Sequence, residues 1–242
     1  MTTRRRFINI GDLRVEVVHK DIKNLHVGVY PPQGRVRVAA PLRLSKEAIR
    51  LAVISRLGWI HRQQTHFAKQ DRQSKREMIT GESHYYQGRR YRLDVIEHDG
   101  PPAVYLRNNT KLELRVRPKT KQDKRAIILN QWYRQQLRGQ FPALLAKWET
   151  KAGVKVTEVR IKKMKTRWGT CNAEARRIWL NLELAKKPVS CLEYILVHEM
   201  VHHQERHHTD HFRDRMDTLL PSWRLLREEL NRAPLAHEEW KY

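Results

Sequence analysis

A run of histidines among apolar residues, from Tyr194 to Phe212, most constrains how this chain can fold. It reads YILVHEMVHHQERHHTDHF and holds six of the 13 histidines of the 242-residue chain. His198 and His202 stand four residues apart, and the residues before His198 are apolar. On a helix, positions four apart share one face, with about 6 Å between Cβ atoms. The pattern therefore predicts a largely buried helix that presents two imidazoles side by side.

Glu199 follows the first of these histidines and completes a His-Glu-x-x-His motif. In this pattern two imidazoles bind a zinc ion, and the carboxylate activates the water that the zinc holds. The apolar neighbours favour a metal site, because a buried histidine pair without a metal would need other hydrogen-bond partners. We therefore predict that His198 and His202 bind zinc and that Glu199 is the catalytic base.

A catalytic zinc also needs a third protein ligand and an open position for water. The candidates are Glu205, His207, His208 and His211. On a continuous helix, Glu205 would lie about 10 Å along the axis from His198, and His207 would point away. Thr209 is a suitable N-cap, and the residues after it are typical of a new helix. A break before Thr209 would bring His208 back to the metal, so we predict His208 as the third ligand, with His211 as the second choice.

The first 118 residues consist mainly of runs in which apolar and polar residues alternate. These runs predict strands over Leu13–Lys20, Leu25–Tyr30, Arg35–Pro41, Tyr91–His98 and Lys111–Val116. A stripe with helical period, from Ser45 to about Gln70, interrupts them. We therefore predict an N-terminal β-rich region over residues 1–118 that contains one helix.

The pattern changes after Arg117–Lys124, a charged stretch that we interpret as a linker. The remaining chain predicts a helix over residues 123–152, strands over 154–164 and 177–185, the histidine helix, and a last helix over 223–230. We expect the strand over 178–184 to line the cleft and to pair with an extended peptide. The order predicts an α+β fold, with residues 119–242 as a second domain of a small sheet packed on helices.

The chain is strongly basic, with 49 Lys and Arg against 26 Asp and Glu and a formal net charge of +23. This excess attracts polyanions, so nucleic acid is a candidate partner through the basic surface. We find no apolar run of about 18 residues, as a membrane span requires, and no secretory h-region. The two cysteines form no Cys-x-x-Cys pair. We therefore expect a cytoplasmic protein without a membrane partner, and we assign neither an oligomeric state nor substrate-binding residues.

Several motifs resemble the YgjP-like metallopeptidase domain family. The His-Glu-x-x-His motif is followed by a third histidine, then by Thr209 and Phe212, as it is in that family. Three other segments are similar to family segments in the same order: GESHYYQGRRYRLDV over residues 81–95, TRWGTC over 166–171 and IWLNLEL over 178–184. The resemblance covers nearly the whole chain, which makes it more specific than a zinc motif alone.

The resemblance implies a zincin-type catalytic unit, related to SprT-like proteases, with Glu199 as the base. The ligands that it implies are His198, His202 and His208. Glu205 stands where metzincins carry glycine, which excludes that class. Three residues beside the site depart from the family pattern: His203, His207 and Arg213. These departures leave the substrate preference open.

The leading hypothesis is a zinc-dependent hydrolase, a metallopeptidase that acts on peptide or protein substrates through a zinc-bound water activated by Glu199. One alternative is a basic nucleic-acid-binding protein whose metal site is structural and closed by a fourth ligand, such as Glu205 or His211. Another is a metal-dependent hydrolase of a non-peptide substrate. Glu199 separates the enzyme from the binding protein, because a binding protein needs no catalytic base.

Overall fold

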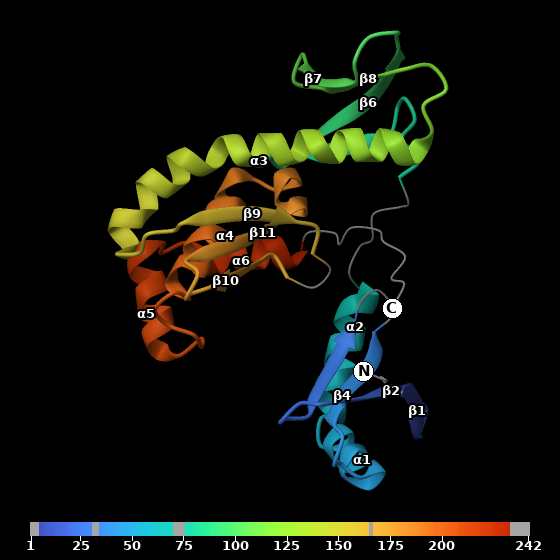
Figure 1. Cartoon of the computed structure of the whole chain (residues 1–242), viewed down its shortest axis with the longest axis vertical. Coiled ribbons are helices and arrows are strands. Elements are labelled where there is room, and N and C mark those ends of the chain that lie inside the picture. The colour runs from blue at the N-terminus through green and yellow to red at the C-terminus, as the bar shows by residue number, and fades with distance from the viewer. Residues whose placement is uncertain (1–4, 31–33, 70–75, 165–166, 233–242) are drawn as a thin grey trace. The chain divides into compact units, whose positions relative to one another are not determined.

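The protein has an α+β fold, as its sequence predicts (Figure 1). The computed structural model describes residues 5–30, 34–69, 76–164 and 167–232. Its contacts divide the chain into two units, Met1–Asp71 and Arg72–Tyr242. Gln70, where the first predicted helix ends, and Thr166, the first residue of the TRWGTC motif, lie outside the described residues.

The first unit is a four-stranded sheet with two helices packed on one face. Its strands are β1 (Arg5–Ile10), β2 (Leu13–Lys20), β3 (His26–Tyr30) and β4 (Arg35–Pro41), in the spatial order β1-β2-β4-β3. The helices are α1 (Lys46–Ile54) and α2 (Leu57–Lys69). Because side chains alternate between the two faces of a strand, Val15, Val17 and Val38 share one face and form a core with Ile49 and Val53 of α1.

The stretch that was predicted as one helix from Ser45 is two helices, which corrects the single helix expected in this region. The backbone N–H of Arg56 bonds the carbonyl of Val53 at 3.0 Å. This i to i−3 bond tightens the last turn of α1 and ends it. A new helix, α2, then begins at Leu57.

The second unit contains two sheets and four α-helices among its described residues. Its first sheet has β5 (Ser83–Tyr86), β6 (Arg89–Glu97), β7 (Ala103–Arg107) and β8 (Lys111–Val116), in the order β5-β6-β8-β7. Its second sheet has β9 (Glu158–Lys162), β10 (Gly169–Asn172) and β11 (Arg177–Asn181), in the order β10-β11-β9. The helices are α3 (Gln122–Ala152), the 3-10 helix η1 (Leu182–Lys186), α4 (Val189–Val201), α5 (Asp210–Leu219) and α6 (Trp223–Arg232).

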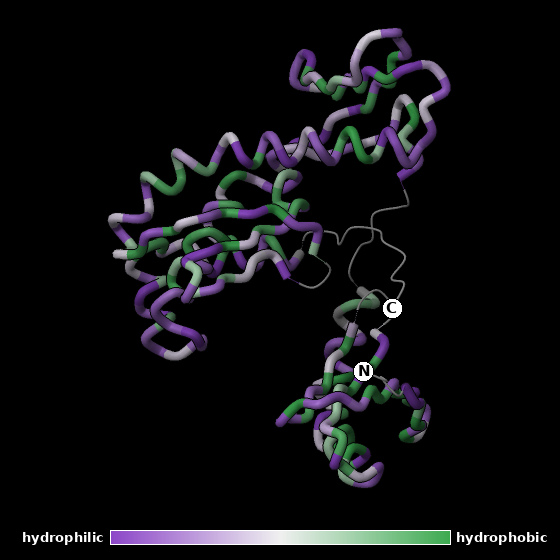
Figure 2. The backbone as a smooth tube through the Cα atoms, viewed as in Figure 1, coloured by the Kyte–Doolittle hydropathy of each residue, from purple (hydrophilic) through white to green (hydrophobic). Residues whose placement is uncertain are grey.

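α3 connects the two halves of this unit. It packs on β7 and β8 and also on η1 and α4 (Figure 1). Hydrophobic and hydrophilic residues alternate along it (Figure 2), and its buried Leu129, Trp132 and Leu137 belong to one core with residues of both sheets. The predicted domain boundary between residues 118 and 119 therefore falls inside the second unit, since α3 buries its apolar side against the strands that precede it.

The two four-stranded sheets share one topology. In each, the first two strands form an antiparallel hairpin, and the second strand pairs in parallel with the fourth. The third strand lies antiparallel beside the fourth. The parallel pairs also correspond in register, with Val15 opposite Val36 in one sheet and Leu93 opposite Leu112 in the other.

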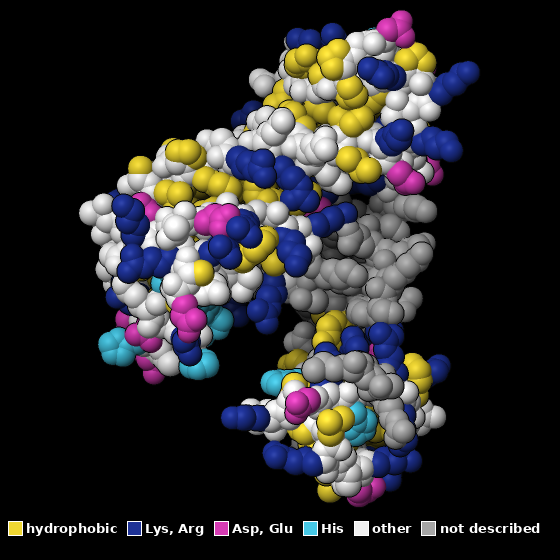
Figure 3. All heavy atoms as spheres, viewed as in Figure 1, with side chains coloured by type: hydrophobic (Ala, Val, Ile, Leu, Met, Phe, Trp, Pro, Cys, Tyr) yellow, Lys and Arg dark blue, Asp and Glu magenta, His cyan; other side chains and the backbone are white. Residues whose placement is uncertain are grey.

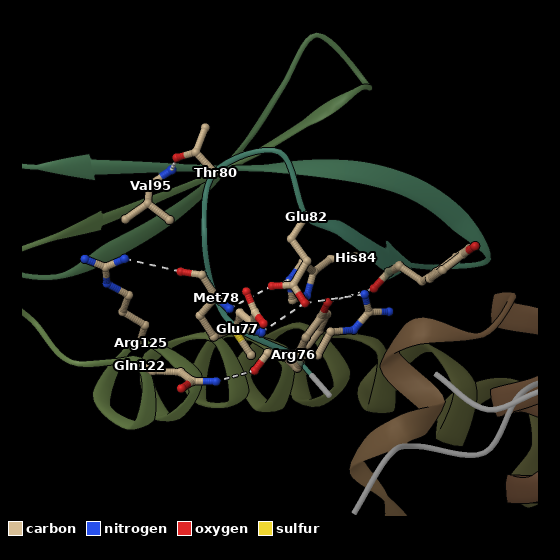
Figure 4. A network of polar contacts seen from close by, with 11 residues as sticks. Arg76, Glu77, Met78, Thr80, Glu82, His84, Val95, Gln122 and Arg125 are labelled. Carbon is tan, nitrogen blue, oxygen red and sulfur yellow. Dashed lines mark hydrogen bonds and ion pairs between the residues drawn. The ribbon is translucent and has the colours of Figure 1, made fainter. Parts of the chain in front are cut away.

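The carboxylate of Glu82 holds the start of the second unit in place (Figure 4). It accepts hydrogen bonds from the backbone N–H groups of Glu77 at 3.2 Å and Met78 at 2.7 Å, and it forms an ion pair with Arg76. Nε2 of His84 donates to the same carboxylate at 3.3 Å. Because burial lowers the pKa of His84 to about 4, this imidazole is neutral at neutral pH.

The surface is basic in many places. Lys and Arg side chains are scattered over the visible surface of each unit rather than gathered in one patch (Figure 3). Among the described helices, none combines the length and the apolar character that crossing a bilayer requires.

Candidate active site

α4 carries the first two predicted ligands and the predicted base. Most of its residues are buried, including Tyr194, Ile195 and Leu196 before the motif and Met200 and Val201 within it. A helix that is apolar nearly all round belongs in a core. The β5–β6 hairpin supports η1, which precedes α4, because the backbone N–H of Gln87 bonds the carbonyl of Ala185 at 2.9 Å. The motif is therefore held by a rigid, buried helix.

The chain leaves α4 at His202, earlier than the break that the sequence predicts just before Thr209. α4 ends with His202 as its C-cap, and a new helix, α5, starts after Thr209. The hydroxyl oxygen of Thr209 accepts a hydrogen bond from the backbone N–H of Phe212 at 3.3 Å, as an N-cap does. This turn brings His208 back toward the end of α4.

The three predicted ligands meet at one point. The Nε2 atom of His202 lies 3.1 Å from that of His198 and 3.0 Å from that of His208. The Nε2 atoms of His198 and His208 are 3.2 Å apart. Among the described residues, these three form the group of side chains able to hold a metal ion together, and His207, His211 and the Glu205 carboxylate are not part of it.

Two neighbours fix the orientation of these rings. Nδ1–H of His202 donates to the carbonyl oxygen of Glu205 at 2.8 Å, which leaves the Nε2 lone pair free to bind a metal. The buried ring of Phe212 packs against all three imidazoles, with centroid distances of 5.0 Å to His198 and 4.7 Å to each of His202 and His208. Glu205 thus contributes to the site through its backbone rather than its side chain.

The residues fit a divalent metal ion. Zinc–nitrogen bonds of about 2.0–2.1 Å in a tetrahedral site place two ligand nitrogens about 3.3–3.4 Å apart, close to the spacing of the three Nε2 atoms. Burial lowers the pKa of His198 to about 3 and also lowers the pKa of His208. The two imidazoles are therefore neutral at neutral pH, with lone pairs available to a metal.

Glu199 lies beside the triad in a dry position. Its side chain is 5% exposed, and burial raises its pKa to about 8, against the opposing charge of Arg167. Its carboxylate packs on the backbone of Gly169, where an added Cβ would lie 2.6 Å from Oε1 of Glu199. Glycine at this position lets β10 approach α4 closely. The Trp-Gly-Thr-Cys stretch, which resembles a family segment, therefore borders the site.

β10 borders the site, which corrects the strand that was expected to line the cleft. The predicted strand over 178–184 corresponds to β11, which lies between β10 and β9 in the middle of its sheet. It ends at Asn181, because the amide of Asn181 bonds the carbonyls of Met164 and Arg167 while its Oδ1 accepts from Glu183 N–H. These bonds begin η1 and hold the loop before β10.

A cavity of about 1020 Å³ opens over the triad and Glu199. Residues 167–174, which include β10, form part of its lining, and Tyr194, Arg206, Arg227 and Leu230 contribute further parts. The site therefore has room for an extended substrate segment beside the predicted base and ligands.

The fold and the site agree with a known family. The family model described as YgjP-like, metallopeptidase domain, matches residues 24–233. The chain belongs to the YgjP-like metallopeptidase domain family. This finding confirms the resemblance of the sequence motifs and places the protein among the metallopeptidases.

Comparisons with other proteins add little to the family match. One solved structure that resembles the chain is the crystal structure of the metallopeptidase zymogen of Pyrococcus abyssi abylysin, with 19% sequence identity and a TM-score of 0.35. The similarity covers 37% of this chain and 90% of that one. No curated protein matches the chain.

In this YgjP-like domain, two arginines that the sequence did not single out also reach the cavity. Arg206 follows the end of α4, and Arg227 lies on α6. Arg206 lies between Glu205 and His207 in the histidine run, whereas Arg227 is far from that run in the sequence. Arg167, which precedes β10, also lines the cavity, whereas His203 and His207 are not in its lining.

Proposed function

We propose that the protein is a zinc-dependent peptidase in which His198, His202 and His208 hold the metal and Glu199 is the general base. The observation that carries this proposal is the convergence of three Nε2 atoms, 3.0–3.2 Å apart, beside a buried carboxylate at the wall of an open cavity. When bound there, zinc supplies Lewis acidity, which lowers the pKa of water and polarises a carbonyl group.

Glu199 is suited to move a proton between water and the leaving amine. In general acid–base catalysis a group works best when its pKa is near the working pH. Burial raises the pKa of Glu199 to about 8, which favours the protonated form that gives a proton to the amine nitrogen. A cation held by the triad would lower this pKa and favour the carboxylate that accepts a proton from water. The contact with Gly169 fixes where that carboxylate lies.

Neighbouring residues also hold the proposed ligands in an orientation that suits metal binding. The bond from His202 to the Glu205 carbonyl fixes the ring tautomer. Phe212 covers one side of the triad and keeps water from that side, because its ring is 1% exposed. The open side faces the cavity, where a substrate can approach.

β10 supports a peptide substrate. It lies at one edge of its sheet and pairs with β11 on one side, while its residues line the cavity. An edge strand can add an extended peptide through backbone hydrogen bonds. We infer that the substrate backbone pairs with β10, next to the base.

A closed structural metal site fits the described residues less well. Such a site needs a fourth protein ligand, for which Glu205 and His211 are the sequence candidates. In the part of the chain that the structure describes, the metal-binding group contains three histidines and neither of these residues. The buried Glu199 carboxylate would also have no purpose in such a site.

Replacing Glu199 by Gln tests the proposal. We expect the variant to lose hydrolysis of a casein substrate by at least about 100-fold, since proton transfer by a positioned base contributes about 10²–10⁴-fold. Its zinc content, measured by elemental analysis, and its thermal unfolding should match those of the wild type.

The matched control is the double substitution His198→Ala, His202→Ala. We expect this variant to lose both bound zinc and hydrolysis, which separates binding of the metal from use of the base. A wild type that purifies without stoichiometric metal under zinc-replete conditions, or a Glu199→Gln variant with full activity, would refute the proposal.

A further inference from the structure

Three arginines from separate segments surround the candidate active site. Arg167 precedes β10, Arg206 follows α4 and Arg227 lies on α6, and all three line the same cavity. The acidic residues of the lining are Glu174 and the buried Glu199. The cavity therefore carries an excess of positive charge before any metal binds, which favours a ligand with negative charge.

The packing of α6 directs Arg227 toward the triad. The ring of Trp223 stacks on Tyr194 of α4, with a centroid distance of 6.4 Å and an interplanar angle of 19°. Arg227 stands four residues after Trp223, on the same face of the helix. Arg227 lines the same cavity as His198 and His208.

Arg227 is also available for a ligand. Its neighbour on α6, Arg224, forms an ion pair with Asp217. By contrast, no carboxylate among the described residues forms an ion pair with Arg227, whose side chain is exposed to the cavity. A guanidinium that borders a cavity and has no carboxylate partner among the described residues is a suitable site for a carboxylate, which it can bind through two parallel hydrogen bonds.

We propose that the cleft selects peptides that carry a carboxylate close to the bond to be cut, and that Arg227 binds this carboxylate. The inference rests on the proposed peptidase function and specifies its substrate class. The carboxylate is either the side chain of an acidic residue or the C-terminus of the peptide. Arg206 and Arg167 add to the attractive field, because charges in a partly enclosed cavity are screened less than charges in water.

The test uses four forms of one peptide that differ at a single residue, Glu or Gln, and at the C-terminus, free or amidated. We expect the wild type to cleave at least one carboxylate-bearing form about tenfold faster, in kcat/KM, than the amidated Gln form. One charge-assisted hydrogen bond of this kind accounts for a factor of about ten or more. The preferred form tells which source of carboxylate the site binds.

The variant Arg227→Gln should reduce this ratio to about one, mainly through KM, and Arg227→Lys should restore part of it. Arg138→Gln is the matched control, because Arg138 is exposed on α3 and lies outside the cavity lining. It should leave the ratio unchanged. An equal fall of kcat for all four peptides would instead give Arg227 a role in the transition state and overturn the proposal, as would an unchanged ratio.

A binding measurement separates this inference from the peptidase proposal. Fluorescence anisotropy of the four labelled peptides with the Glu199→Gln variant reads affinity without hydrolysis. Tighter binding of a carboxylate form, lost in the Glu199→Gln, Arg227→Gln double variant, supports the inference even if the wild type cleaves none of them. Equal binding of all four peptides overturns it, even if the wild type is an active peptidase.

Discussion

At the scale of single residues, the geometry of the site depends on the lack of a side chain at Gly169 as much as on the proposed ligands. Gly169 permits β10 to pass so close to α4 that a methyl group at this position would lie 2.6 Å from Oε1 of Glu199 and 2.8 Å from Cγ2 of Ile195. Neither the backbone of β10 nor the buried side chains of Glu199 and Ile195 can move away easily. The orientation of the base therefore depends on a residue with no side chain of its own.

Gly169→Ala should displace the Glu199 carboxylate or β10. We expect hydrolysis to fall by about tenfold or more, since small misplacements of catalytic groups have large effects on rate, and unfolding free energy to fall by about 1–3 kcal/mol, as overpacking usually costs. Zinc content should not change. Assays of hydrolysis, denaturation and metal content check these three results.

Gly139→Ala provides the control for this substitution. Gly139 lies within α3, and an added Cβ there meets no atom within 4 Å. Alanine is favoured over glycine inside a helix by about 0.5–1 kcal/mol, so the control should be as stable as the wild type or slightly more stable, with full hydrolysis. Equal activity of both variants would contradict the role assigned to Gly169.

The sequence predicts which three histidines come together, but it does not predict the residues around them. His198, His202 and His208 could be chosen because a helix fixes the spacing of the first two and Thr209 marks the break that returns the third. Arg227 could not be found in this way. It comes near the triad only because Trp223 packs on Tyr194, a contact between helices that no local pattern encodes.

At the scale of elements, the segment between α4 and α5 determines where His208 lies relative to His198 and His202. The N-cap hydroxyl of Thr209 sets where α5 begins, and the first turn of α5 places Phe212 against the three imidazoles. The N-cap of α5 and the proposed metal site are thus joined through Phe212.

Thr209→Ala should lower both the stability of the protein and its affinity for zinc. Loss of an N-cap costs about 1 kcal/mol of stability, and a looser start of α5 should lower zinc affinity several-fold. Thr209→Ser keeps the hydroxyl and should retain both properties. Chemical denaturation and zinc titration against a competing chelator measure the two effects, and an Ala variant that binds zinc as tightly as the Ser variant would argue against the coupling.

Some elements could not be predicted because their sequences do not alternate clearly. β1, β5, β7 and β10 were not expected as strands, and each is an edge strand of its sheet. One of them, β10, is four residues long and includes the glycine that the site requires. Edge strands bury less apolar surface than central strands, so their hydrophobic signal is weaker. The central strands β2, β4, β6, β8 and β11 match predicted stretches, and so do the edge strands β3 and β9.

At the scale of the whole molecule, acid should destabilise the second unit through His84. This buried imidazole has a pKa of about 4 in the folded protein, against about 6.5 in an unfolded chain. Burial is the main cause, with Arg76 and Lys186 acting in the same direction and Glu82 against it. Between these two values the unfolded state binds more protons, so stability falls as the pH decreases.

The stability that this group contributes is complete above about pH 6.5, and about 3 kcal/mol at most is lost by about pH 4. Urea denaturation between pH 4.5 and 7.5 should show a flatter profile for His84→Gln than for the wild type. The difference between the two proteins isolates His84 from other titrating groups. Parallel profiles would show that His84 does not cause the loss.

The division of the chain was harder to predict than its elements. The charged stretch Arg117–Lys124 has the composition of a linker, yet α3 beyond it shares a core with β8 before it. The contacts instead separate the chain near residue 71. The composition of a segment indicates whether it is exposed to solvent. A domain boundary depends instead on which helices and strands pack together, and these can lie far apart in the sequence.

The repeated topology of the two four-stranded sheets has a consequence for how the chain acquires its fold. In each sheet, the second strand pairs with the fourth strand rather than with the third, as β2 does with β4 and β6 with β8. Because the two sheets share this topology, a strand of one sheet could pair wrongly with a strand of the other while the chain folds. Synthesis from the N-terminus removes the competition, because β1–β4 can close their sheet before β6 and β8 have left the ribosome.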